Sequence, residues 1–140
     1  MTMCMRVAIA AAMLAVAAPT FAAEPAPEGA KVYIIWPGDG TVIKGGKFWL
    51  RMGLIKMGIA PAGVEKAETG HHHLIIDAEL PPMDEPIPND SNHLHFGKGQ
   101  TEARIELPPG SHTLQLLLGD ANHIPHNPPV ESEKITVVVP

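Results

Sequence analysis

The chain has very little cysteine and few aromatic side chains, and it has no long apolar run after its first residues. Its one cysteine, Cys4, lies close to the N-terminus. Disulfides, thiolate metal ligands and cysteine nucleophiles are therefore excluded from the rest of the 140 residues. A domain built from this remainder must be stabilised by a packed apolar core alone.

Basic residues are also scarce. Ten Lys and Arg stand against 15 Asp and Glu, which gives a formal charge of −5 at pH 7. Because an acidic surface repels phosphate backbones and no basic cluster offsets it, the composition predicts no nucleic-acid partner. An acidic balance does suit the binding of cations.

The N-terminal segment has the three parts of a secretory signal. Arg6 supplies the positive region, residues 7–18 form a short apolar stretch, and Thr20 and Ala22 are small residues before a cleavage site. The apolar stretch is too short to cross roughly 30 Å of hydrocarbon comfortably. We expect a signal peptide over residues 1–22, a periplasmic or secreted protein without a membrane span, and a mature chain of about 118 residues.

The remainder of the sequence has the short apolar patterns of β-strands. Residues 47–57 alternate between apolar and other side chains, which is typical of a half-buried antiparallel strand, and no sustained helical period occurs. Proline-rich residues 80–99 form a long loop, and Pro108, Pro109 and Gly110 predict a hairpin turn. The expected strands are residues 32–36, 41–43, 47–57, 71–79, 100–107, 111–119 and 134–139.

This pattern predicts an all-β fold, an antiparallel immunoglobulin-like β-sandwich of six or seven short strands with long loops rich in Pro and Gly. An open barrel is the alternative. Residues 23–30 are expected to form a disordered leader, and residues 31–140 a single β-sandwich domain.

All eight histidines lie between His71 and His126. In a strand, residues i and i+2 point to the same side, so a His-x-His pair can present two imidazoles to one ion. Two such pairs and one His-x-x-His pair occur. The candidate metal ligands are His71, His73, His93, His95, His123 and His126.

Imidazole without thiolate suits Zn(II), Cu(II) or Ni(II), and we expect copper or zinc. The alternative for each histidine is a hydrogen bond to a backbone carbonyl of a loop. His72 and His112 share strand faces with leucines and are predicted to be structural.

The leading hypothesis is therefore an exported domain that binds, delivers or buffers a transition metal. The alternative is a cell-envelope interaction module without a metal, which contacts a protein or glycan. Catalysis has no positive support, because no serine lies in a Gly-x-Ser-x-Gly elbow and no complete phosphate-binding loop occurs.

Several segments resemble those of an exported bacterial family, the domain of unknown function 4399. The resemblance extends from Val32 to about Val139. It rests on residues 57–63 (MGIAPAG), 69–77 (TGHHHLIID), 92–102 (NHLHFGKGQTE), 109–120 (PGSHTLQLLLGD) and 123–126 (HIPH). The resemblance implies an exported β-domain in which the histidine-bearing segments are family features, and it names no ligand or reaction.

Overall fold

The computed structural model describes residues 21–140, which contain nine strands and no helix. The strands are β1 (Lys31–Trp36), β2 (Thr41–Val42), β3 (Lys47–Ile55), β4 (Gly58–Ile59), β5 (Thr69–Ile76), β6 (His93–His95), β7 (Glu102–Glu106), β8 (Gly110–Gly119) and β9 (Ile135–Val139). The predicted all-β class is confirmed. Within this part of the chain, no helix is long and apolar enough to cross a bilayer.

The predicted signal peptide falls almost entirely on residues 1–20, which lie outside the described residues, so it stays a prediction. Residues 24–26, part of the predicted disordered leader, hydrogen-bond to the loop that follows β8. The Ala26 amide donates to the carbonyl of Asn127, and the Asn127 amide donates to the carbonyl of Glu24.

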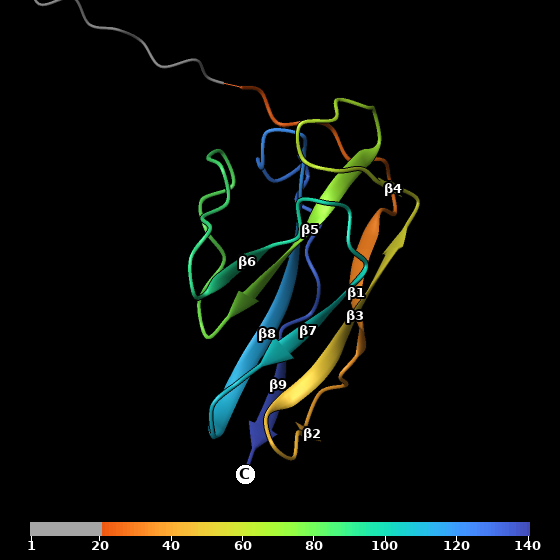
Figure 1. The fold of residues 1–140 in the computed structure, drawn as a ribbon. Helices are drawn as coiled ribbons and strands as arrows, with labels where there is room; N and C mark the ends of the chain where they lie inside the picture. Colours follow the sequence, from red (N-terminus) through yellow and green to blue (C-terminus); the bar gives the residue numbers. More distant parts are fainter. Residues whose placement is uncertain (1–20) are drawn as a thin grey trace, which may run out of the picture.

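The strands form two sheets (Figure 1). One has the order β1-β3-β7 and curls like half of a barrel, and the other has the order β2-β9-β8-β5-β4, with β6 paired to β5. The main core lies between them, with Leu50 and Met52 contributed by the first sheet and Leu74, Leu116 and Val137 by the second. The two-sheet arrangement agrees with the sequence prediction, whereas the immunoglobulin-like type of sandwich is not confirmed.

Strand β3 shows how the sequence sets the orientation of the smaller sheet. Phe48, Leu50 and Met52 are buried, whereas the alternate residues Lys47, Trp49 and Arg51 are exposed. This is the period-2 alternation that the sequence predicts, because successive side chains of a strand point to opposite faces. The outward face of this sheet is therefore polar and aromatic.

The predicted hairpin between residues 100–107 and 111–119 is wrong. Strand β7 pairs with β3, where Ile105 lies opposite Phe48, whereas β8 pairs with β5 and β9 in the other sheet. Two prolines in the turn, Pro108 and Pro109, have no amide hydrogen to donate, so a ladder cannot run on through it. The turn instead carries the chain from one sheet to the other.

Strand β5 is buried on both faces. Leu74 packs in the main core, and Ile75 packs with Ile87 and Leu117 in a second cluster on the opposite face. Ile87 belongs to the proline-rich segment predicted as a long loop, which folds over the outer face of the larger sheet and contains β6. This cover is what encloses the histidines of β5.

His112 joins β8 to the end of β5. Its Nδ1 lies 2.6 Å from a carboxylate oxygen of Asp77, and its Nε2 lies 2.8 Å from the carbonyl oxygen of Pro108. Because both partners are acceptors, both ring nitrogens must carry hydrogen, which is the protonated form. The hydrogen bond to Asp77 is the main cause that raises the pKa of His112 above its usual value. The role is structural, as the sequence predicts.

Replacing His112 with alanine should lower the free energy of unfolding by about 1.5–3 kcal/mol at pH 5.5, the range for hydrogen bonds to charged groups. A raised pKa stabilises the fold fully below about pH 6.5, and this contribution is lost as the pH rises through the pKa of the folded state. Urea unfolding should therefore show a smaller difference between the variant and the wild type at pH 8.5. Ser111→Ala, an exposed change on the same strand, is the control; a difference that grows with pH contradicts the assignment.

Candidate metal centre

Strand β5 places two candidate ligands side by side. His71 and His73 project from the same face of the strand, and both side chains are fully buried. In the pairing of β5 with β8, His71 lies opposite Gly119 and His73 lies opposite Leu117. The sequence prediction that this His-x-His pair presents two imidazoles in one direction agrees with the structure, where their ring centroids are 4.7 Å apart.

Strand β6 supplies a third imidazole. His95 lies directly opposite His73 in the antiparallel pairing of β5 with β6. Its ring centroid is 5.1 Å from that of His73 and 5.0 Å from that of His71. One histidine of the second His-x-His pair thus meets the first pair, because β6 pairs with β5.

The fourth imidazole comes from the turn after β8. The buried carboxylate of Asp120 accepts hydrogen bonds from the backbone amides of Asn122 and Ile124, which closes the turn. His123 lies inside it with a φ of 67°, a left-handed conformation that histidine adopts more readily than most residues. Its carbonyl accepts a hydrogen bond from the amide of Ile87, so the covering segment also holds it in place.

Together His71, His73, His95 and His123 form a compact group, called the histidine cluster below. The separations between their ring centroids range from 4.7 to 6.1 Å. For His71, His95 and His123, one nitrogen from each ring lies within 4.8 Å of the other two, close enough to hold one metal ion. The Nε2 atoms of His71 and His95 are 3.2 Å apart, and two nitrogens bound to one tetrahedral ion would be about 3.3 Å apart.

Several nitrogens of the cluster have no hydrogen-bond partner. Both ring nitrogens of His73 and the Nδ1 of His71 are buried without one. Because a buried polar atom without a partner costs about 1–3 kcal/mol, proteins rarely keep several in one place without a ligand or ion. The cluster therefore has the unsatisfied lone pairs that a metal ion requires.

The electrostatics of the cluster favour neutral imidazoles. Burial lowers the pKa of His71 to about 4 and that of His73 to about 2, with further lowering from the neighbouring histidines. Burial also lowers the pKa of His95. Since only neutral imidazole coordinates a metal ion, these residues are in the ligating form at neutral pH.

Glycines give the rings the room they occupy. A Cβ atom on Gly97 would overlap Cε1 and Nε2 of His95, and a Cβ on Gly119 would lie 2.7 Å from Cε1 of His73. Both contacts are shorter than side chains normally make. Neither glycine is among the residues predicted from the sequence; the available signal was the position of Gly97, two residues after His95.

The remaining two candidates, His93 and His126, have hydrogen-bond partners outside the cluster. His93 places its Nδ1 2.8 Å from a carboxylate oxygen of Asp90. His126 directs its Nε2 to the carbonyl oxygen of Thr69, 3.0 Å away. The structure thus brings together four of the six predicted ligands. His93 and the Nε2 of His126 have other partners in the protein, whereas the Nδ1 of His126 is buried without a partner.

His72 points to the opposite face of β5 from the cluster. Its side chain is fully buried, and neither ring nitrogen has a hydrogen-bond partner. Burial alone lowers its pKa to about 4. It is the one histidine of the consecutive three that the cluster does not include.

The histidine-bearing segments lie in a part of the chain that matches a known protein family. The model of the family described as domain of unknown function (DUF4399) matches residues 50–140. The chain belongs to the DUF4399 family. All four histidines of the cluster lie inside the matched segment, as the sequence resemblance implies. No curated protein and no solved structure matches the chain.

Replacing His72 with leucine should stabilise the metal-free protein and weaken its response to acid. A pKa lowered to about 4 means that the unfolded state binds the proton more tightly, so stability present above about pH 6.5 is lost as the pH falls toward 4. At about 1.4 kcal/mol per pH unit, His72 accounts for roughly 3 kcal/mol of that loss. Chelator-treated protein unfolded in urea at pH 8 and pH 4.5 measures the effect. Equal acid sensitivity of variant and wild type would refute it.

Replacing Gly97 with alanine should weaken metal binding while leaving the fold intact. The added Cβ meets the end of a side chain, so the His95 ring moves and the backbone does not have to. We expect at least about a tenfold loss of affinity, the scale seen when the support of a metal ligand is removed. Gly58→Ala is the matched control, because its Cβ would make an ordinary 3.5 Å contact with Thr69. Equal affinities for the two variants would show that ring placement is unimportant.

Proposed function

We propose that this DUF4399 domain binds one transition metal ion, copper or zinc, through His71, His95 and His123, with His73 as the fourth ligand. The observation that carries the proposal is the convergence of the three ligating nitrogens within 4.8 Å. They come from two strands and a turn that are distant in sequence. The proposed role is binding, delivery or buffering of the ion.

The chemistry of the ligand set supports copper or zinc. All four ligands are imidazoles, and within residues 21–140 there is no cysteine to supply a thiolate. Hard cations such as calcium and magnesium prefer oxygen ligands, whereas imidazole nitrogen suits Zn(II) and Cu(II). Where both ions are present at equal activity, the general order of affinities favours copper.

The arrangement supports storage or transfer of the ion rather than turnover. With His73 as the fourth ligand, four protein nitrogens would complete a tetrahedral shell, whereas a catalytic zinc site keeps one position open for water. His71 and His73 are fully buried, while His95 and His123 are partly exposed. A partner protein would thus approach the ion from the side of β6 and the turn after β8. There its own ligands could replace His95 or His123 first.

We further propose that the protein acts in the periplasm or outside the cell. The support is the signal-like sequence of residues 1–22, with its single positive charge, short apolar stretch and small residues before the cleavage site. In such a compartment, a protein partner of the envelope would donate or accept the ion.

Titration of metal-free, untagged protein with Zn(II) and Cu(II) should show one ion bound per chain. The double variant His71→Ala/His73→Ala removes two of four ligands and should lower the affinity by at least about a hundredfold, because ligand number dominates the binding free energy. Isothermal titration calorimetry measures both quantities. Cu(II) should in addition show the absorption and spin-resonance signature of nitrogen coordination.

The double variant His93→Ala/His126→Ala is the matched control, since it removes the two predicted ligands that lie outside the cluster. Its affinity should stay close to that of the wild type. Far-ultraviolet circular dichroism should confirm that both variants fold. Absence of stoichiometric binding, or equal losses in the two double variants, would overturn the proposed function.

A further inference from the structure

A second surface with the features of a binding site lies on the smaller sheet. The chain has only two tryptophans and one tyrosine, and all three lie on or beside the outer face of β1 and β3. Trp36 and Trp49 are each 47 % exposed. Tyr33 packs over Gly53, where a Cβ would overlap its ring. Exposed indoles are costly in water, and their concentration on one face marks a contact surface.

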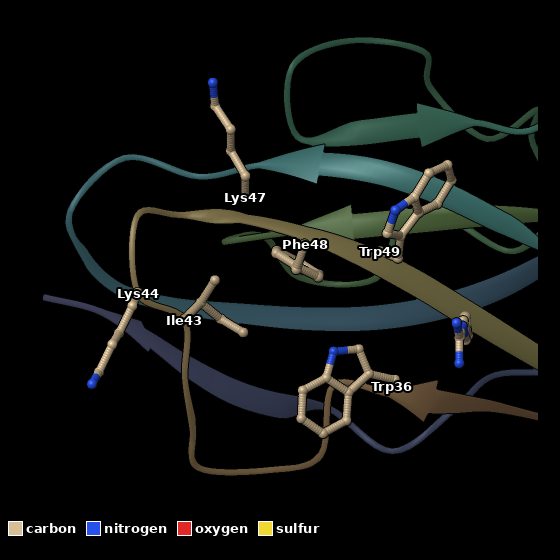
Figure 2. Close-up of a pocket in the computed structure, with 7 residues that line it drawn as sticks. Trp36, Ile43, Lys44, Lys47, Phe48 and Trp49 are labelled. Atoms are coloured by element: carbon tan, nitrogen blue, oxygen red, sulfur yellow. The ribbon is translucent and has the colours of Figure 1, made fainter.

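The two tryptophans flank a groove of about 490 Å³ (Figure 2). Their indoles lie on either side of β3, and Phe48 contributes to the apolar lining between them. Lys44 and Lys47 stand at one end of the groove in Figure 2, and Arg51 also lines it. The volume lies within the range of small-molecule and oligomer subsites.

The charge of this lining is opposite to that of the chain. The groove has three cations and no carboxylate, on a protein of formal charge −5. Two of these cations are within 4 Å of glutamates on β7: Lys47 is 3.6 Å from Glu106, and Arg51 is 3.8 Å from Glu102. Exposed pairs of this kind are worth little, so the cations can exchange them for a ligand.

Arg104 lies beside the indole of Trp49. Its guanidinium lies 6.0 Å from the centre of the ring, at the outer limit of a cation–π contact, and comes from the residue directly opposite on β7. The groove thus has the indole of Trp49 beside a guanidinium, the indole of Trp36 across from it, and positive groups at its edge. Such a surface offers stacking and charge together.

We propose that this groove binds an acidic polysaccharide, one whose sugar rings carry carboxylates. Pyranose rings present flat C–H faces that stack on indoles, their carboxylates pair with Lys44, Lys47 or Arg51, and their hydroxyls donate hydrogen bonds to Glu102 and Glu106. Those two glutamates offset part of the positive charge of the groove, which suits a sugar chain with spaced carboxylates better than the charge-dense surface of an anionic lipid membrane.

The proposal is independent of the metal site. No residue of the histidine cluster lines the groove, which is built on the other sheet. Most of the lining also lies before residue 50, outside the segment that matches the family model. The surface is thus a property of this chain that stands or falls separately from metal binding.

Because Trp36 and Trp49 are the only tryptophans, intrinsic fluorescence reports on the groove directly. Untagged protein is titrated with oligogalacturonate and with alginate oligomers, and the methyl-esterified galacturonate serves as an uncharged probe of the same ring. We expect a saturable change with the acidic oligomers, weaker binding of the ester, and a loss of affinity with added salt. Chelator should leave the result unchanged.

Trp36→Ala and the pair Lys44→Gln/Arg51→Gln should each weaken binding about tenfold or more, as expected for an aromatic anchor or a charged contact. For the tryptophan variant, calorimetry replaces fluorescence. Val64→Ala and Lys66→Gln, exposed changes outside the groove, are the controls. The proposal is overturned by no saturable binding of either acidic oligomer, by equal binding of the ester, by groove variants that bind like the wild type, or by binding only to vesicles of anionic phospholipid.

Discussion

The structure depends on one constraint, the burial of neutral imidazoles on both faces of β5. On one face His71 and His73 have ring nitrogens without hydrogen-bond partners, and on the other face so does His72. Such groups destabilise a metal-free fold and are tolerated only where packing from all sides holds them. The proposed metal ion would change this balance on one face alone, since it would convert unsatisfied lone pairs of His71 and His73 into coordinate bonds.

The surrounding architecture serves that burial. The covering segment supplies β6 and the second apolar cluster, and the Asp120 turn brings His123 across the end of β8. Gly97 and Gly119 leave the space that the rings occupy. The exposed aromatic face of the smaller sheet lies apart from this arrangement, so the two proposed binding sites lie on different sheets of one small domain.

Much of the fold could be predicted from the sequence because it follows from local pattern. The alternation of β3 and the boundaries of β1, β5 and β9 are close to the predicted ones. Long-range pairing could not be predicted in the same way: β7 pairs with β3, about 50 residues earlier in the chain, and two prolines direct the chain away from the hairpin. For the site, His-x-His spacing identified the pairs of β5 and β6, whereas only the register of these strands decides that His95 joins the cluster and His93 does not.

X-ray absorption at the metal edge of the copper- or zinc-loaded protein tests the central claim most directly, since it reports the atoms bound to the ion. The account predicts a shell of three or four imidazole nitrogens at about 2.0 Å, with the multiple scattering typical of histidine rings, and loss of that pattern in the His71→Ala/His73→Ala variant. A shell made mainly of oxygen, or an imidazole shell that the double variant leaves unchanged, would contradict it.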